Sequence, residues 1–300
     1  MPTPGTPSVQ PSGSVRTTGS GRPSDSCVTC GTPLAGRYCH ACGERALNPR
    51  DTRLGAFLRD ALAGVLDLDS RLWRSFRALV TRPGLLTAEH IRGRRRPYLG
   101  PLQVFLLANL LFFAVLTTIG GFNTFTTQLR YQVGQPVYGE VAERLVARRG
   151  APASPERQAY ARRFDESTEH YANSLVILMV PLFAVVLWLL HGCRRPFVHE
   201  TVMALHFLAF TLLVMIALPL LIRAAGWVAP AAAVRMESDL VLSVILTAGL
   251  GLYLAAALRR GFGCGVGASL ARGLVGAVAM VPVLTIYRML LFFAVYFTLD

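Results

Sequence analysis

The sequence predicts an all-α polytopic membrane protein with about five transmembrane helices and a small N-terminal cytoplasmic zinc ribbon. Hydrophobic residues make up 53% of the 300 residues and charged residues 16%, whereas soluble domains average ~45–50% and ~25%. The apolar residues are gathered in five long stretches, and two Cys-x-x-Cys pairs precede them. These observations exclude a disordered chain, a disulfide-stabilised miniprotein and a typical cytosolic enzyme.

Each apolar stretch approaches the ~20 residues, or about 30 Å of helix, that cross the hydrocarbon layer of a bilayer. The alternative interpretation is that these stretches form the core of a large soluble α-protein, but core helices rarely contain so many consecutive residues without a charge. The predicted spans are residues 101–119, 173–190, 201–222, 240–258 and 274–299, within a membrane domain of residues 101–300.

The basic residues set the expected orientation. All 30 are arginine, and they cluster before the first span, between the second and third, and between the fourth and fifth. The positive-inside rule therefore predicts a cytoplasmic N-terminus and an external C-terminus. All six cysteines fall on the same side, where thiols stay reduced. Residues 1–25 are a Pro/Ser/Gly/Thr-rich tail that we expect to be disordered, and they contain no signal peptide.

The strongest chemical signal is a pair of motifs, Cys27-Val-Thr-Cys30-Gly and Cys39-His-Ala-Cys42-Gly. Four thiolates suit tetrahedral Zn²⁺ and leave no coordination position open, so the zinc would be structural. A glycine after each pair can take the positive φ of a turn that wraps around a metal. Iron in a rubredoxin-like site and a redox dithiol pair are the alternatives. We expect a compact ribbon over residues 26–48, with His40 exposed rather than ligating.

Residues 51–98 are predicted to form juxtamembrane amphipathic helices. One apolar stripe runs from Leu54 to Leu66, and a second runs from Leu72 to Val80 with Arg71, Arg74 and Arg77 on its other face. Basic amphipathic helices beside a span commonly lie in the membrane interface. Packing on the cytoplasmic ends of the spans and a separate soluble domain are the alternatives. Arg92, Arg94, Arg95 and Arg96 then form an expected electrostatic anchor before the first span.

The loop at 120–172 is long enough to contain helices. Residues 140–149 have helical spacing with a Glu140–Arg144 pair, and Ser154 followed by Pro155 is a helix start. We expect this loop to be a mixed-charge, solvated hairpin without a catalytic motif.

Ionisable residues within the spans are the other candidate site residues. His199 and Glu200 open the third span and His206 follows His199 by seven residues, so both histidines lie near one face. The three residues could bind a metal or relay a proton; alternatively, Glu200 pairs with Arg194 or Arg195. Arg288 interrupts the fifth span. Its predicted roles are structural pairing with Glu237 or Asp239, or a part in a substrate or ion path.

Several motifs together resemble a bacterial family of zinc-ribbon membrane proteins, the domain of unknown function 3667. They are the cysteine motifs continued to Glu44 and Arg45, Thr81-Arg-Pro-Gly84, Gly93-Arg-Arg-Arg-Pro-Tyr98, residues 197–210, and Ile286-Tyr-Arg288. The resemblance spans roughly residues 26–299 and implies a multi-pass protein of the bacterial cytoplasmic (inner) membrane, without a reaction. The third span of that family opens with Glu-His, whereas here His199 precedes Glu200.

The sequence contains no nucleophile elbow, no phosphate-binding loop and no paired carboxylates within a span, so an enzyme is the least favoured class. We expect a membrane-tethered interaction or scaffold protein that binds a cytoplasmic protein partner through its zinc ribbon. The alternative is a small-solute or ion transporter or channel that uses His206, Glu200 and Arg288. Anionic lipid explains the excess of arginine, so a nucleic-acid partner is not needed.

Overall fold

The computed structural model describes residues 26–44, 46, 71–119, 125, 127–228 and 239–299. Within these residues all regular elements are helices, apart from isolated bridge residues in the cysteine-rich segment, which confirms the predicted fold class. The predicted N-terminal tail, the first amphipathic stripe and Glu237 lie outside the described residues. The helices are α2 (Arg71–Thr81), α3 (Leu85–Ile91), α4 (Pro101–Ile119), α5 (Leu129–Gln132), α6 (Gly139–Ala147), α7 (Pro155–Leu175), η2 (Val176–Leu178), α8 (Met179–Leu190), α9 (Phe197–Val228), α11 (Asp239–Phe262) and α12 (Val266–Thr298).

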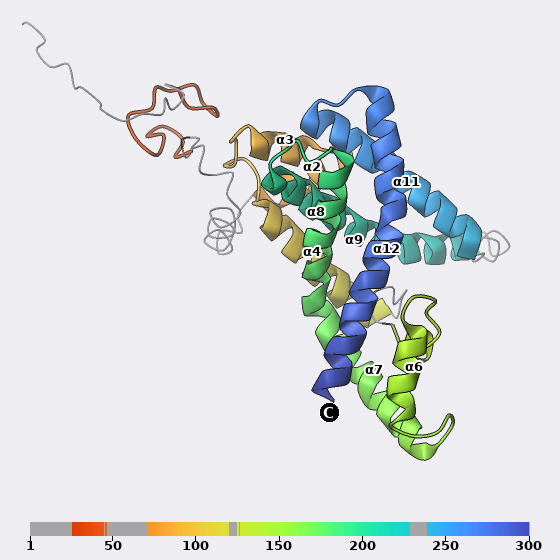
Figure 1. Ribbon diagram of the computed structural model, residues 1–300. Coiled ribbons are helices and arrows are strands. Elements are labelled where there is room, and N and C mark those ends of the chain that lie inside the picture. The colour runs from red at the N-terminus through yellow and green to blue at the C-terminus, as the bar shows by residue number, and fades with distance from the viewer. Residues whose placement is uncertain are drawn as a thin grey trace, which may run out of the picture.

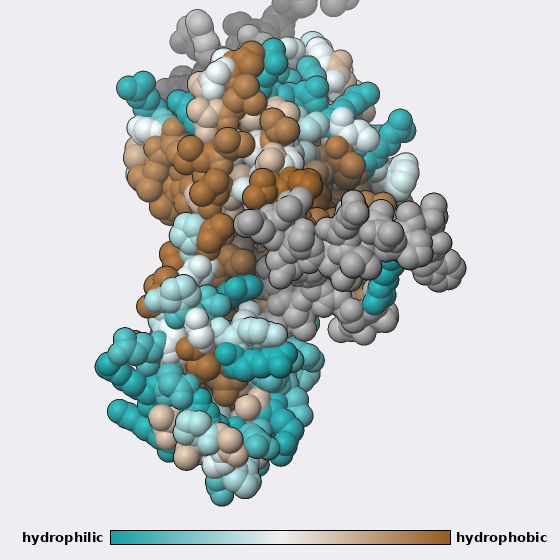
Figure 2. Space-filling model, turned by 90° about the vertical axis from the view of Figure 1, so that its right-hand side faces the viewer, coloured by the Kyte–Doolittle hydropathy of each residue, from teal (hydrophilic) through white to brown (hydrophobic). Residues whose placement is uncertain are grey.

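Among the described residues, four segments are long and apolar enough to cross a bilayer: Pro155–Leu190, Phe197–Leu221, Leu242–Phe262 and Val266–Thr298. A fifth apolar helix, α4, has 19 residues, which is about 28 Å of helix. Large apolar side chains face outward on these helices, and Figure 2 shows hydrophobic residues gathered over the upper part of one face. Because water disfavours such a surface and lipid does not, the protein is a multi-pass membrane protein.

The helices extend beyond the predicted spans because flanking polar turns remain helical. The second span is the apolar end of a rod in which α7, η2 and α8 follow one another without a loop. At 33 residues, α12 is roughly 50 Å long, which exceeds the hydrocarbon thickness. A helix of this length spans a bilayer with a tilt or with one end outside the hydrocarbon layer.

Different helices and turns lie at the two ends of the bundle. Figure 1 shows α2 and α3 at one end, beside the turns that join α8 to α9 and α11 to α12. The helices α6 and α7 and the C-terminus lie at the opposite end, where Figure 2 shows hydrophilic residues. Short turns between antiparallel helices account for this arrangement, since each crossing of the bundle reverses the chain direction.

Two glycines permit close helix packing at the end that carries α3. A Cβ added to Gly273 of α12 would lie 2.6 Å from the Gly251 carbonyl oxygen of α11. Gly84 precedes α3 with φ +76°, and an added Cβ would lie 2.3 Å from the carbonyl oxygen of Ala257. These contacts hold α3 and α12 directly against the backbone of α11.

The predicted solvated hairpin is instead packed on the C-terminal part of α12. The Ser154 hydroxyl accepts a hydrogen bond from the Arg157 N–H, and Glu140 pairs with Arg144, as the sequence predicts. However, the inner side of α7 is buried, and the ring of its Phe164 lies 5.5 Å from that of Phe292 on α12. Burial of aromatic residues of α12 against α7 explains the difference from the expected hairpin.

Candidate metal centre and its contact with the membrane domain

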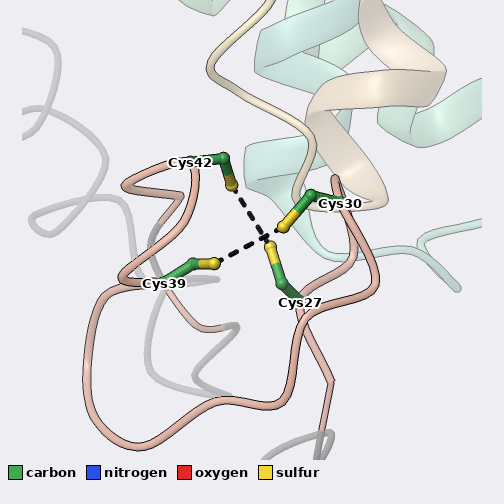
Figure 3. A group of neighbouring side chains, drawn as sticks. All are labelled: Cys27, Cys30, Cys39 and Cys42. Atoms are coloured by element: carbon green, nitrogen blue, oxygen red, sulfur yellow. Dashed lines mark hydrogen bonds between the residues drawn. The ribbon is translucent and has the colours of Figure 1, made fainter.

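The four predicted cysteine ligands come together in space. Their Sγ atoms all lie within 4.8 Å of one another, and Figure 3 shows the four side chains pointing toward a common centre. The Cys27–Cys42 and Cys30–Cys39 Sγ atoms are each 3.5 Å apart. A metal with ~2.3 Å bonds to four tetrahedral sulfurs would hold them about 3.8 Å apart, so the cluster has the size of a metal site.

Two turns of the same form present these thiols. In the first, the Cys27 N–H donates to the Thr32 carbonyl and the Gly31 N–H donates to the Cys27 carbonyl. In the second, the Cys39 N–H donates to the Glu44 carbonyl and the Gly43 N–H donates to the Cys39 carbonyl. Gly31 and Gly43 have φ of 76° and 69°, in the left-handed region that glycine adopts without strain. Each Cys-x-x-Cys-Gly motif therefore folds as a metal-binding turn.

The thiols differ in acidity. The hydroxyl and backbone N–H of Thr32 lower the pKa of Cys30 to about 6. The backbone N–H of Glu44 favours the Cys42 thiolate, but burial and the neighbouring thiols outweigh it and raise the pKa of Cys42 to about 12. Thiolates are the metal-binding form, so a metal must displace protons from this cluster. His40 is exposed, as expected, and lies outside the group.

A buried carboxylate connects the cysteine-rich segment, here called the Cys ribbon (residues 26–44), to the membrane domain. Glu44 is 3% exposed. Its Oε2 atom accepts a hydrogen bond from the Thr29 hydroxyl at 2.9 Å and from the backbone N–H groups of Arg95 and Arg96, each at 3.1 Å. One carboxylate oxygen therefore links both metal-binding turns to the loop between α3 and α4.

Two arginines of the same loop strengthen this contact. The Arg94 Nε donates to the Val28 carbonyl at 2.8 Å, and the guanidinium of Arg96 lies over Gly43, where a Cβ would collide with it. The loop itself is anchored, because the Leu99 N–H donates to the Ser75 hydroxyl of α2 at 2.8 Å. The loop with Arg94, Arg95 and Arg96, which the sequence predicts to be a lipid anchor, is also a docking loop for the Cys ribbon. Sequence reasoning missed the role of Glu44.

The candidate residues within the membrane helices contact different partners rather than one another. The Glu200 Oε1 lies 2.9 Å from the Nδ1 of His191, and both side chains are almost completely buried. The Nδ1 of His206 lies 2.8 Å from the Thr87 hydroxyl of α3. Among the described residues only the four cysteines form a group of metal-ligating side chains. His199, Glu200 and His206 are therefore not gathered as a metal site, and Glu200 pairs with His191 rather than Arg194 or Arg195.

The remaining candidate, Arg288, is half-buried on α12 and lines a cavity between α9, α11 and α12. Of its two predicted partners, Glu237 and the side chain of Asp239 lie outside the described residues. The structure therefore places Arg288 in the wall of this cavity, which the sequence did not indicate.

The comparison with protein families bears on the docking loop. Residues 69–113 match a family model described as Protein of unknown function (DUF3667). Over these residues the chain is similar to that family. This segment contains α2, α3, the loop that receives Glu44, and most of α4. The predicted resemblance is thus confirmed over the part of the chain that contacts the Cys ribbon. No match was found among curated proteins or among solved structures.

Proposed function

We propose that the protein is a membrane-tethered scaffold whose structural zinc ribbon is docked in one orientation on the DUF3667 segment. The observation that carries this proposal is the buried Glu44 carboxylate, which joins the ribbon to the loop before α4. A ribbon on a flexible tether would need no such contact. A docked ribbon presents a fixed surface next to the bilayer, which suits the recruitment of a protein partner.

Zinc is the metal that we propose for this site. Four thiolates bind Zn²⁺ or iron in a tetrahedral site, but a redox function would require a path for electrons, which a scaffold does not. The residues that would hold the ion are Cys27, Cys30, Cys39 and Cys42. Absorption spectroscopy separates the two metals, because an iron–thiolate centre is coloured and a zinc centre is colourless. Visible absorbance that scales with protein-bound metal would contradict the zinc assignment.

The proposed location is the bacterial inner membrane, with the N-terminus in the cytoplasm and the C-terminus outside. This orientation follows from the arginine flanks and from the need for reduced thiols at the zinc site. It also leaves α2 at the cytoplasmic interface, where Trp73 is 72% exposed beside Arg74 and Arg77. An outward indole flanked by basic residues is typical of a helix that lies against lipid headgroups.

The exposed face of the ribbon is the proposed partner surface. Tyr38 is 63% exposed, and aromatic side chains of this kind are common anchors in protein interfaces. The test is photo-crosslinking in whole cells from a probe at residue 38, in the wild type and in Glu44→Ala. We expect a specific adduct in the wild type and its loss in Glu44→Ala. Equal crosslinking in both proteins would show that docking plays no part in recruitment.

A transporter or channel that uses His206, Glu200 and Arg288 is the second candidate. One observation favours it: the Oε2 of the buried Glu200 has no hydrogen-bond partner among the described residues, and such groups mark ion or proton paths in membrane proteins. Flux into vesicles that is lost in His206→Ala but retained after deletion of residues 1–50 would favour transport over the scaffold. Absence of flux in the wild type would remove this candidate.

A further inference from the structure

A cavity of about 390 Å³ lies between α9, α11 and α12. Cavities of ~300–1,000 Å³ with apolar walls are the common form of small-ligand sites. Three helices contribute matching segments to this cavity, 211–219 from α9, 242–250 from α11 and 280–288 from α12. Each segment advances eight residues, which is about 12 Å of helix. The cavity is therefore elongated along the helices rather than round.

The two ends of this α9–α11–α12 cavity differ in chemistry. Because α11 runs antiparallel to both α9 and α12, the end that contains Thr211, Leu250 and Met280 lies toward the α8–α9 turn. The Thr211 hydroxyl donates to the Phe207 carbonyl at 3.0 Å, so its proton is already used within α9. The opposite end contains Pro219 and Arg288. An apolar end and a cationic end match a ligand with one chain and one anionic head.

Neighbouring contacts place Arg288 toward the α5–α7 end of the bundle. The hydroxyl of the adjacent Tyr287 donates to the backbone carbonyls of Phe125 and Ala172, which lie where the α5–α7 region meets the bundle. From Arg288, α12 continues ten residues to Thr298, about 15 Å beyond the guanidinium. Arg288 lies 22 residues from Val266, where α12 begins, which is about 33 Å of helix and roughly one hydrocarbon thickness. A span that begins with α12 would therefore bring Arg288 to the headgroups and leave Met280 among the lipid chains.

We propose that the α9–α11–α12 cavity binds one free fatty acid, with its carboxylate at Arg288 and its chain directed toward Met280. A guanidinium fork matches the geometry of a carboxylate, and its planar charge tolerates a partly apolar setting. A cavity of about 390 Å³ that extends about 12 Å along the helices suits a single chain, whereas a phospholipid would leave its second chain outside. This proposal concerns the membrane domain and is independent of the zinc ribbon.

Native mass spectrometry of the full-length protein in detergent, titrated with palmitate or with the uncharged hexadecanol, tests the proposal. We expect one saturable palmitate per chain. Arg288→Gln should weaken palmitate binding at least tenfold and leave hexadecanol binding unchanged, and Arg288→Lys should restore most of the loss. Leu246→Trp fills the cavity and should weaken both ligands, whereas Ile245→Trp is a matched control on the outer, 63% exposed face of α11.

Several results would overturn the proposal. These are no saturable palmitate binding by the wild type, equal loss of palmitate and hexadecanol in Arg288→Gln, or equal binding by the two tryptophan variants. Competition by phosphatidylglycerol as strong as that by palmitate would also contradict a single-chain fatty acid. If Leu246→Trp does not fold, the wild type and the two Arg288 variants still decide the outcome.

Discussion

Removal of the Glu44 carboxylate should release the Cys ribbon from the membrane domain. In Glu44→Ala, the backbone N–H groups of Arg95 and Arg96 lose their acceptor, which lies 3.1 Å from each nitrogen. A hydrogen bond to a charged group is worth ~1.5 kcal/mol or more, so two give about 3 kcal/mol. Because every ~1.4 kcal/mol is a tenfold change, the ratio of docked to undocked ribbon should fall roughly a hundredfold.

Hydrogen–deuterium exchange of the peptide that contains residues 93–98 measures this release. We expect the amides of Arg95 and Arg96 to exchange roughly a hundredfold faster in Glu44→Ala than in the wild type. Glu140→Ala is the matched control, since the Glu140 side chain is 80% exposed and its ion pair with Arg144 lies within α6. Unchanged exchange in Glu44→Ala would refute the docking role of Glu44.

The remaining predictions concern the metal, the packing of α3 and a buried pair. Removal of the metal by a chelator should accelerate hydrogen exchange at the Arg95 and Arg96 amides, because the turn that positions Glu44 is held by the metal-bound Cys39 and Cys42. Equal exchange rates with and without metal would contradict this. Gly84→Ala should lower the melting temperature by several degrees, because Gly84 has a φ of +76° and an added Cβ would collide with Ala257. Gly265→Ala is the control, since a Cβ at Gly265 would meet open space. Equal melting temperatures for the two variants would be inconsistent with close packing at Gly84. Glu200→Ala should destabilise the protein by ~1–3 kcal/mol, because it removes the carboxylate that lies 2.9 Å from the buried His191 ring. An apolar replacement of both residues should recover much of that loss in a melting assay, and additive losses would argue against a coupled pair.

Local patterns explain what could be predicted from the sequence. Hydropathy averages over ~20 residues and does not depend on the partner of each helix, so the apolar helices and the fold class were predictable. The spacing of Cys27, Cys30, Cys39 and Cys42 is likewise local, since each pair lies on one turn with its own glycine. The helix start at Ser154 also depends only on its neighbours.

Long-range contacts explain what could not be predicted. Glu44 contacts Arg95, which is 51 positions further along the chain, and nothing in the sequence around Glu44 indicates that partner. The pairing of His191 with Glu200 requires the tight α8–α9 turn, whose geometry hydropathy does not report. The α9–α11–α12 cavity depends on how three helices diverge along their length, which is a property of packing and not of any single segment.

The zinc content of the full-length protein, purified under reducing conditions without a chelator, tests the central claim most directly. We predict one zinc ion per chain in the wild type and a large loss in Cys39→Ser, which removes one of the four thiolates. A wild-type protein without zinc, or a Cys39→Ser variant that retains the full amount, would contradict the assignment of the Cys ribbon as a structural zinc site.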